Sequence, residues 1–186
     1  MRILIPIGAL FLALPLGLAG YREGPLPNMT GGFGEPSCQS CHFGNALNAP
    51  GGKLALTGVP ATYAAGREYA ITVTLARAAL ARGGFEISSR FASGPQKGKQ
   101  AGIWRAAAPR LQIIPSQSDP KLMFVQHTSA GSIAPSPGSN SWTMSWTAPA
   151  PASVAVQFNV AANATNDDAS PLGDYIYLSE ALARAR

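Results

Sequence analysis

Both cysteines of this 186-residue chain and one of its two histidines lie in a single motif, Cys38-Gln39-Ser40-Cys41-His42. Two thiols three positions apart can each form a thioether bond with one vinyl group of a haem, and the adjacent imidazole can bind the iron as an axial ligand. The motif predicts covalently attached haem c, held by Cys38 and Cys41, with His42 as an iron ligand. Such a group is suited to electron transfer.

Three other interpretations of the motif stay open. A thioredoxin-like redox pair would open a helix after a strand, whereas the flanking residues 31–36 and 45–52 are rich in Gly, Pro and Asn. A zinc site would need a fourth strong ligand, for which the chain offers His127 or a carboxylate. A disulfide across so short a loop would stabilise the fold little and would leave His42 without a role.

The residues around the motif are expected to form loops. Residues 20–52 lack the apolar periodicity of the helices that enclose haem in ordinary small cytochromes c. We therefore expect a loop-rich haem-binding segment whose haem lies against another part of the chain.

Residues 53–180 are expected to supply that wall. Apolar and polar side chains alternate there in short runs separated by turn residues, which is the pattern of half-buried strands. About eight runs predict an all-β domain, an antiparallel β-sandwich with Trp142, Met144 and Trp146 in its core. Residues 181–186 are expected as a C-terminal tail. The expected strands are 53–56, 69–75, 85–91, 111–114, 122–128, 142–146, 154–160 and 175–178.

Residues 1–19 have the features of a secretory signal peptide. Arg2 precedes an almost wholly apolar run from 3 to 18, and cleavage after Ala19 would leave 167 residues (186 − 19). The run is short for a membrane span of about 20 residues and contains Pro6 and Pro15, although an uncleaved anchor stays open. We expect a periplasmic or extracellular protein with no stable membrane span after cleavage.

The charge pattern argues against a nucleic-acid partner. The formal net charge is +5, but Lys and Arg are scattered singly, without a basic run or interleaved aromatic residues. The partner expected of a haem protein is another redox protein.

Several short motifs suggest a family. In chain order they are Cys38-x-x-Cys41-His42, Gly83-Gly84-Phe85-Glu86, Gln126-His127-Thr128-Ser129-Ala130-Gly131, Trp142-x-x-x-Trp146-Thr147-Ala148-Pro149, Asn163-Ala164 and Gly173-Asp174-Tyr175-Ile176-Tyr177. This order resembles the exported bacterial choice-of-anchor V domain proteins, which are related to the Reelin (Reeler) domain. The resemblance spans residues 31–178 and implies a Reeler-like, immunoglobulin-like β-sandwich preceded by the Cys-x-x-Cys-His segment. It implies no enzymatic activity.

His127 is the second candidate iron ligand. If Leu122 and Phe124 face the core of a strand with alternating sides, His127 points outward, where the haem could lie. His127 would then be the sixth ligand, and bis-histidine iron predicts a comparatively low reduction potential. Met123, or a vacant or water-filled position, stays open as an alternative.

Two functional classes remain from the sequence. The first is an exported monohaem c-type cytochrome-like protein that transfers electrons. The second is a Reeler-like adhesion or ligand-binding module whose cysteines form a disulfide or a metal site. No motif of a hydrolase, a phosphate-binding loop or a metalloprotease occurs in the chain. The polar residues 163–174 lack the spacing of a calcium loop and are expected to form a solvated turn.

Overall fold

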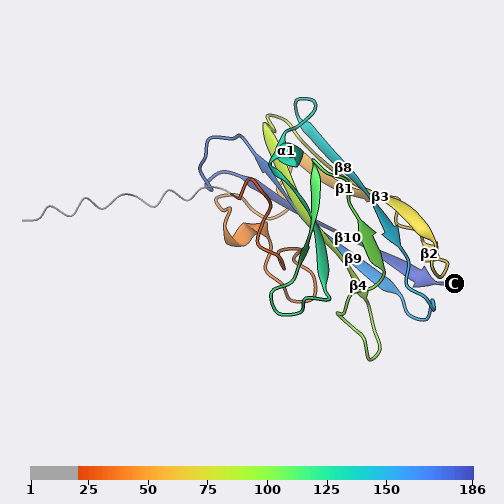
Figure 1. The fold of residues 1–186 in the computed structure, drawn as a ribbon. Helices are drawn as coiled ribbons and strands as arrows, with labels where there is room; N and C mark the ends of the chain where they lie inside the picture. The colour runs from red at the N-terminus through yellow and green to blue at the C-terminus, as the bar shows by residue number, and fades with distance from the viewer. Residues whose placement is uncertain (1–20) are drawn as a thin grey trace, which may run out of the picture.

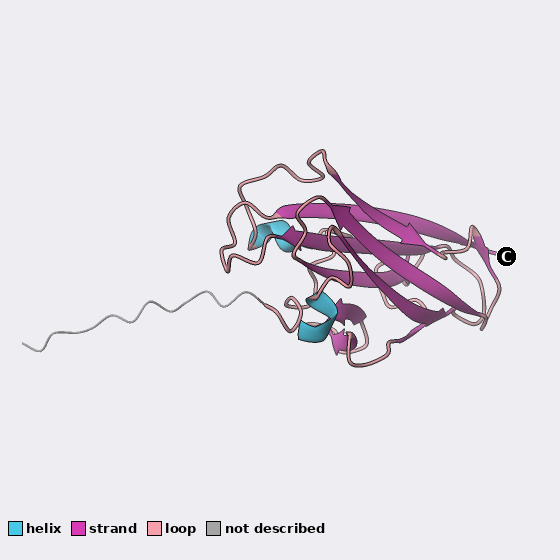
Figure 2. Ribbon diagram, turned by 90° about the horizontal axis from the view of Figure 1, so that it is seen from above, coloured by secondary structure: helices cyan, strands magenta, loops and turns pink. Residues whose placement is uncertain are grey.

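The computed structural model describes residues 21–186, and these residues form two β-sheets packed face to face, as predicted for a β-sandwich (Figures 1 and 2). The predicted signal peptide, residues 1–19, lies outside the described residues. In the part of the chain that is described, no helix is long and apolar enough to cross a membrane.

One sheet has four strands and the other has six. The first, in spatial order, consists of β1 (Gly52–Thr57), β3 (Glu68–Arg77), β8 (Ser139–Thr147) and β5 (Ile103–Arg105). The second consists of β2 (Thr62–Tyr63), β10 (Tyr175–Ala185), β9 (Val156–Thr165), β4 (Arg82–Phe91), β7 (Met123–His127) and β6 (Leu111–Pro115). Only the short β2–β10 pair is parallel among these strands. Two short helical turns, η1 (Cys38–Ser40) and α1 (Ser129–Ser132), complete the described elements.

Alternate residues of the strands fill the space between the two sheets. Ile71 and Val73 of β3 are fully buried, whereas Thr72 between them is only partly buried. The Trp146 ring of β8 packs edge-on against Phe158 of β9, with 4.9 Å between the ring centroids, and so links the two sheets. The predicted core position of the tryptophan strand is confirmed.

The strands differ from the prediction in several places, and β9 runs to Thr165, into the expected turn at 163–174. Strands β2 and β5 have two and three residues, which is too few to leave an alternating pattern. Strand β10 runs through the expected tail, residues 181–186, as far as Ala185. Its end is held because Ala183 is fully buried and pairs with Val156 of β9.

The N-terminal segment, residues 21–51, lies across the outer face of the six-stranded sheet. It consists mostly of loops, as expected, and Figure 1 shows it in red to orange at one side of the sandwich. The backbone N–H of Met29 donates to Glu86 of β4 at 2.7 Å. Gly32 lies so close to β9 that a Cβ there would be 2.3 Å from Cγ of Asn159, which explains why this position has no side chain.

Charged groups are buried under this segment. Glu86 is fully buried and accepts hydrogen bonds from Met29 and from the side chain of Gln126, the latter at 2.6 Å. Loss of hydration raises the pKa of Glu86 to about 8, and the negative charge of Glu35 adds to the shift. Glu35 itself forms an ion pair with Arg90 and accepts a hydrogen bond from the Thr30 hydroxyl at 2.6 Å.

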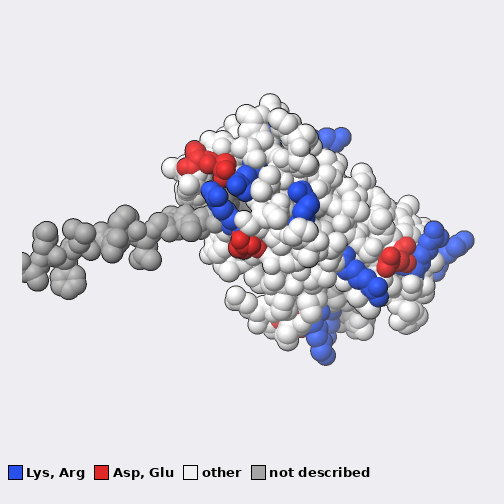
Figure 3. Space-filling model, turned by 45° about the horizontal axis from the view of Figure 1, so that its top comes forward, with Lys and Arg blue, Asp and Glu red and all other residues white. Residues whose placement is uncertain are grey.

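On the visible surface, charges are sparse. The face in Figure 3 shows basic and acidic side chains as small separate groups between uncharged residues. This arrangement agrees with the scattered charges of the sequence.

Glu86 makes the stability of the fold depend on pH. Its pKa is higher in the folded chain than the ordinary value of 4.5, so its contribution to stability is complete below pH 4.5 and is lost as the pH rises through about 8. Between these pH values the unfolding free energy of the wild type falls as the pH rises. In Glu86→Gln this slope should be smaller by up to about 1.4 kcal/mol per pH unit. Urea denaturation at several pH values measures this. Glu68→Gln, at an exposed position, is the control, and parallel curves for wild type and Glu86→Gln would contradict the assignment.

Candidate functional site

The Cys-x-x-Cys-His motif forms one tight turn at the η1 helix. The Ser37 side chain caps this turn by accepting the N–H of Gln39 at 3.3 Å. The backbone N–H groups of Cys41 and His42 both point to the carbonyl of Cys38, at 3.2 and 3.0 Å. The turn therefore brings the three predicted residues Cys38, Cys41 and His42 together, and both cysteines are free thiols.

The environment of Cys38 does not suit a redox pair of the thioredoxin type. Cys38 is partly buried and Cys41 is exposed. Burial raises the pKa of the Cys38 thiol to about 12, and the negative charge of Glu86 acts in the same direction. Nucleophilic cysteines of thioredoxin-like sites have a lowered pKa instead. Cys38 is a protonated thiol at neutral pH.

His42 is held by a buried carboxylate. Its Nδ1 lies 2.6 Å from Oδ2 of Asp174, which is 3% exposed. A carboxylate can only accept, so Nδ1 carries a proton; in the neutral ring this tautomer leaves the lone pair on Nε2. The same arrangement orients histidines that bind metals, because the second hydrogen bond fixes the tautomer and the direction of the ring.

Asp174 is in turn fixed by two asparagines. The Asn163 side chain donates to Oδ2 of Asp174 at 3.3 Å, and the Asn45 side chain donates to the backbone carbonyls of Gly173 and Asp174 at 2.8 and 3.1 Å. The sequence indicated only a solvated turn here. Asp174 is buried because residues 42–45 of the N-terminal segment pair with the loop that precedes β10, a contact between parts of the chain about 130 residues apart.

Exposed apolar side chains lie beside the motif. Phe43 pairs with Leu172 in an isolated bridge, and these residues are 49% and 57% exposed. Leu47 of the same segment is also exposed. We call these three residues the apolar flank. Large apolar side chains next to a ligand-bearing turn are suited to cover one side of a flat apolar group.

His127 lies on the same face of the sheet but is held by backbone groups. Nδ1 of His127 lies 3.0 Å from the backbone nitrogen of Phe85 and 3.2 Å from its carbonyl oxygen, and the backbone of Tyr21 is a further partner of the ring. Burial lowers the pKa of His127, so the ring is neutral. The expected sides of this strand are reversed, because Val125 belongs to the core between the sheets whereas Gln126 points to Glu86 under the N-terminal segment.

The ring of His127 nevertheless reaches the neighbourhood of the motif. It lies over Gly84, where a Cβ would be 2.5 Å from its Cε1. Gly84 pairs in the sheet with Asn163, the residue that contacts Asp174 and His42. The structure thus brings His127 to the edge of the His42 site, with no ring nitrogen directed at His42.

The residues around the motif fit a covalently attached haem. Two free thiols lie on one turn, an oriented imidazole keeps an Nε2 lone pair, and the apolar flank lies next to them. Asn163 Oδ1 is buried there without a hydrogen-bond partner. Among residues 21–186, no group of three or more His, Cys, Asp or Glu side chains is placed to hold a metal ion, so the zinc interpretation gains no support.

Asp174 should control the tautomer of His42. In the chain produced without haem, ¹⁵N NMR is expected to show the His42 proton on Nδ1. Asp174→Ala should abolish that preference and lower the unfolding free energy by about 1–3 kcal/mol, because the buried donors lose their acceptor. Asp168→Ala, at an exposed position in the preceding loop, serves as the control. An unchanged tautomer in Asp174→Ala would refute the role of Asp174.

Known structures similar to this chain are distant from it in sequence. No family model matches the sequence, and no curated protein matches it. Among solved structures, the reeler domain of human F-spondin is 17% identical, with a TM-score of 0.44 over 76% of this chain and 95% of that chain. A cohesin module of a Clostridium perfringens family 33 glycoside hydrolase is 10% identical, with a TM-score of 0.49 over 73% and 96%.

Proposed function

We propose that this domain is an exported c-type haem protein that transfers electrons, with haem attached through Cys38 and Cys41 and with His42 as an axial ligand of the iron. The observation that carries the proposal is the 2.6 Å contact between Nδ1 of His42 and the buried carboxylate of Asp174. A core position or a surface role for His42 would not need a buried carboxylate that leaves Nε2 available. Haem iron supplies a one-electron couple when it is bound.

Each part of the site has a task in this proposal. The capped η1 turn holds the two thiols close together on one turn. Asp174 holds the imidazole in one tautomer. A carboxylate on Nδ1 also makes the imidazole a stronger electron donor, which favours the oxidised state of a bound metal and a low reduction potential. The apolar flank, whose side chains are exposed, would cover one side of the bound haem. The partner is a second redox protein outside the cytoplasm.

A binding module without haem is the second candidate. It is favoured by the sandwich fold and by the same apolar flank, which would then be available to a partner. The two candidate functions differ in what covers Phe43 and Leu172, which is haem in the first and a partner in the second. An experiment that detects haem therefore distinguishes them.

Haem attachment is tested by export of the protein in cells that carry a cytochrome c maturation system. Wild type should be red and should keep its haem through denaturing electrophoresis, because thioether bonds survive unfolding. Cys38→Ala/Cys41→Ala should be colourless. A folded but colourless wild type, made beside a control cytochrome that matures normally, would leave only the binding module.

The sixth ligand is tested by carbon monoxide. The hydrogen bonds of His127 to Phe85 and Tyr21 favour an exchangeable sixth position, since ligation would require the ring to give up a backbone partner. The reduced haem protein is then expected to bind carbon monoxide, and His127→Asn should leave its spectrum unchanged. A wild-type spectrum that does not respond to carbon monoxide, with a response in His127→Asn, would instead identify His127 as the ligand predicted from the sequence.

A further inference from the structure

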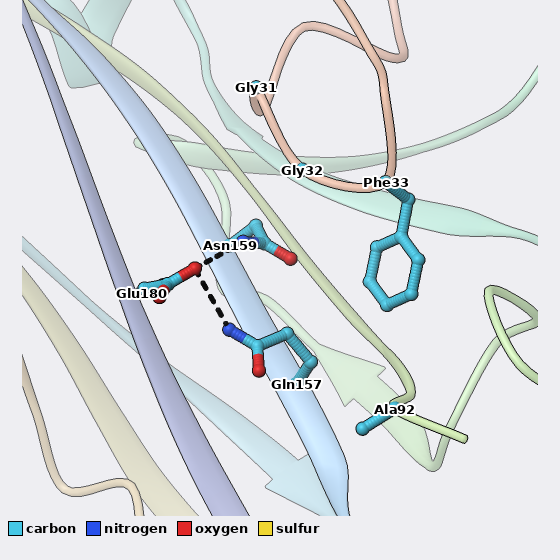
Figure 4. A pocket seen from close by; sticks show the side chains of 7 residues that line it. All are labelled: Gly31, Gly32, Phe33, Ala92, Gln157, Asn159 and Glu180. Atoms are coloured by element: carbon cyan, nitrogen blue, oxygen red, sulfur yellow. Dashed lines mark hydrogen bonds between the residues drawn. The ribbon is translucent and has the colours of Figure 1, made fainter.

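A second site lies on the outer face of the six-stranded sheet, beside the N-terminal segment. It is a pocket of about 280 Å³ between the Gly31–Phe33 turn and strands β9 and β10 (Figure 4). None of the motif residues lines it. The haem proposal therefore does not account for it.

The polar groups of this pocket are arranged as acceptors. The side-chain nitrogens of Gln157 and Asn159 both donate to Oε2 of Glu180, at 3.2 and 3.5 Å. Their carbonyl oxygens consequently point away from Glu180, as Figure 4 shows. Asn159 is 8% exposed, and its Oδ1 is buried with no hydrogen-bond partner. This oxygen lies against Gly32, so the acceptors that face the pocket are those of Glu180 and Gln157.

An aromatic ring forms the opposite wall. Phe33 is 38% exposed and has a φ of 53°, a backbone conformation that non-glycine residues rarely adopt. This conformation directs the ring over the pocket (Figure 4). The Arg90 guanidinium lies 5.1 Å from the ring centroid, but its charge is compensated by Glu35. The Glu180 carboxylate, in contrast, has no ion-pair partner among the described residues.

We propose that this pocket binds a primary ammonium or guanidinium group, carried either by a free amine or by a lysine or arginine side chain of another protein. An ammonium has three donors and no acceptor. The pocket offers acceptors in Glu180 and Gln157 Oε1, the Asn159 side chain holds Glu180 in place from below, and the face of Phe33 attracts a cation. The site does not depend on haem.

The test is an NMR titration of the full exported protein with n-butylammonium and with Nα-acetyl-lysine methylamide. Saturable shifts are expected for the side-chain amides of Gln157 and Asn159. Glu180→Gln should weaken binding about tenfold, because one charge-assisted hydrogen bond is lost. Phe33→Leu should also weaken it, and Glu68→Gln, on the other sheet, is the control without effect.

The outcomes are distinct. Binding of n-butylammonium as tightly as the lysine derivative, or more tightly, supports a free amine as ligand, and tighter binding of the lysine derivative supports a protein side chain. An equal response to n-butanol, or affinity unchanged in both Glu180→Gln and Phe33→Leu, would overturn the proposal. Loss of haem from the motif would not affect the titration, so the two sites fail independently.

Discussion

The hydrogen bond between His42 and Asp174 depends on the docking of a loop segment onto a sheet face that is polar yet buried. Outward positions of β4 and β9 carry Glu86, Ser88, Arg90, Asn159 and Asn163, all of them buried. Polar groups buried in this way are stabilising only where the covering segment supplies partners. Met29 and Glu35 supply partners for Glu86 and Arg90, and Asn45 donates to the loop that holds Asp174, which fixes the path of the chain around the Cys-x-x-Cys-His turn.

The cost of this arrangement is visible in the same interface. Glu86 is held with a raised pKa, and the polar atoms Ser88 Oγ, Arg90 Nε, Asn159 Oδ1 and Asn163 Oδ1 are buried without hydrogen-bond partners. An interface made only for stability would be better served by apolar residues. These unpaired polar groups lie beneath one segment, and both the His42 site and the Glu180 pocket lie along it.

The sequence was sufficient for the sandwich and for the motif, but not for what surrounds the motif. Strand alternation is a local property, so the cores of β3, β8 and β9 could be predicted. The outward positions of β4 and β9 are polar, and by the same rule they predict exposure to solvent. They are buried because a segment distant in the sequence covers them, and no local sequence pattern predicts that contact. The sequence predicted only a solvated polar turn around Asp174. Asp174 becomes the partner of His42 because residues 42–45 pair with that turn. The sides of β7 escaped prediction because Val125, rather than Phe124, belongs to the core, and because the ring of His127 is held by the backbone of Phe85.

The central claim is that the thiols of the η1 turn carry a haem whose iron is held by His42. Mass spectrometry of tryptic peptides from the exported, reduced and alkylated protein tests this most directly. The account predicts that the peptide containing both cysteines is heavier by one haem and resists alkylation at both sulfurs. Complete alkylation of both cysteines, in protein exported beside a functioning maturation system, would contradict it.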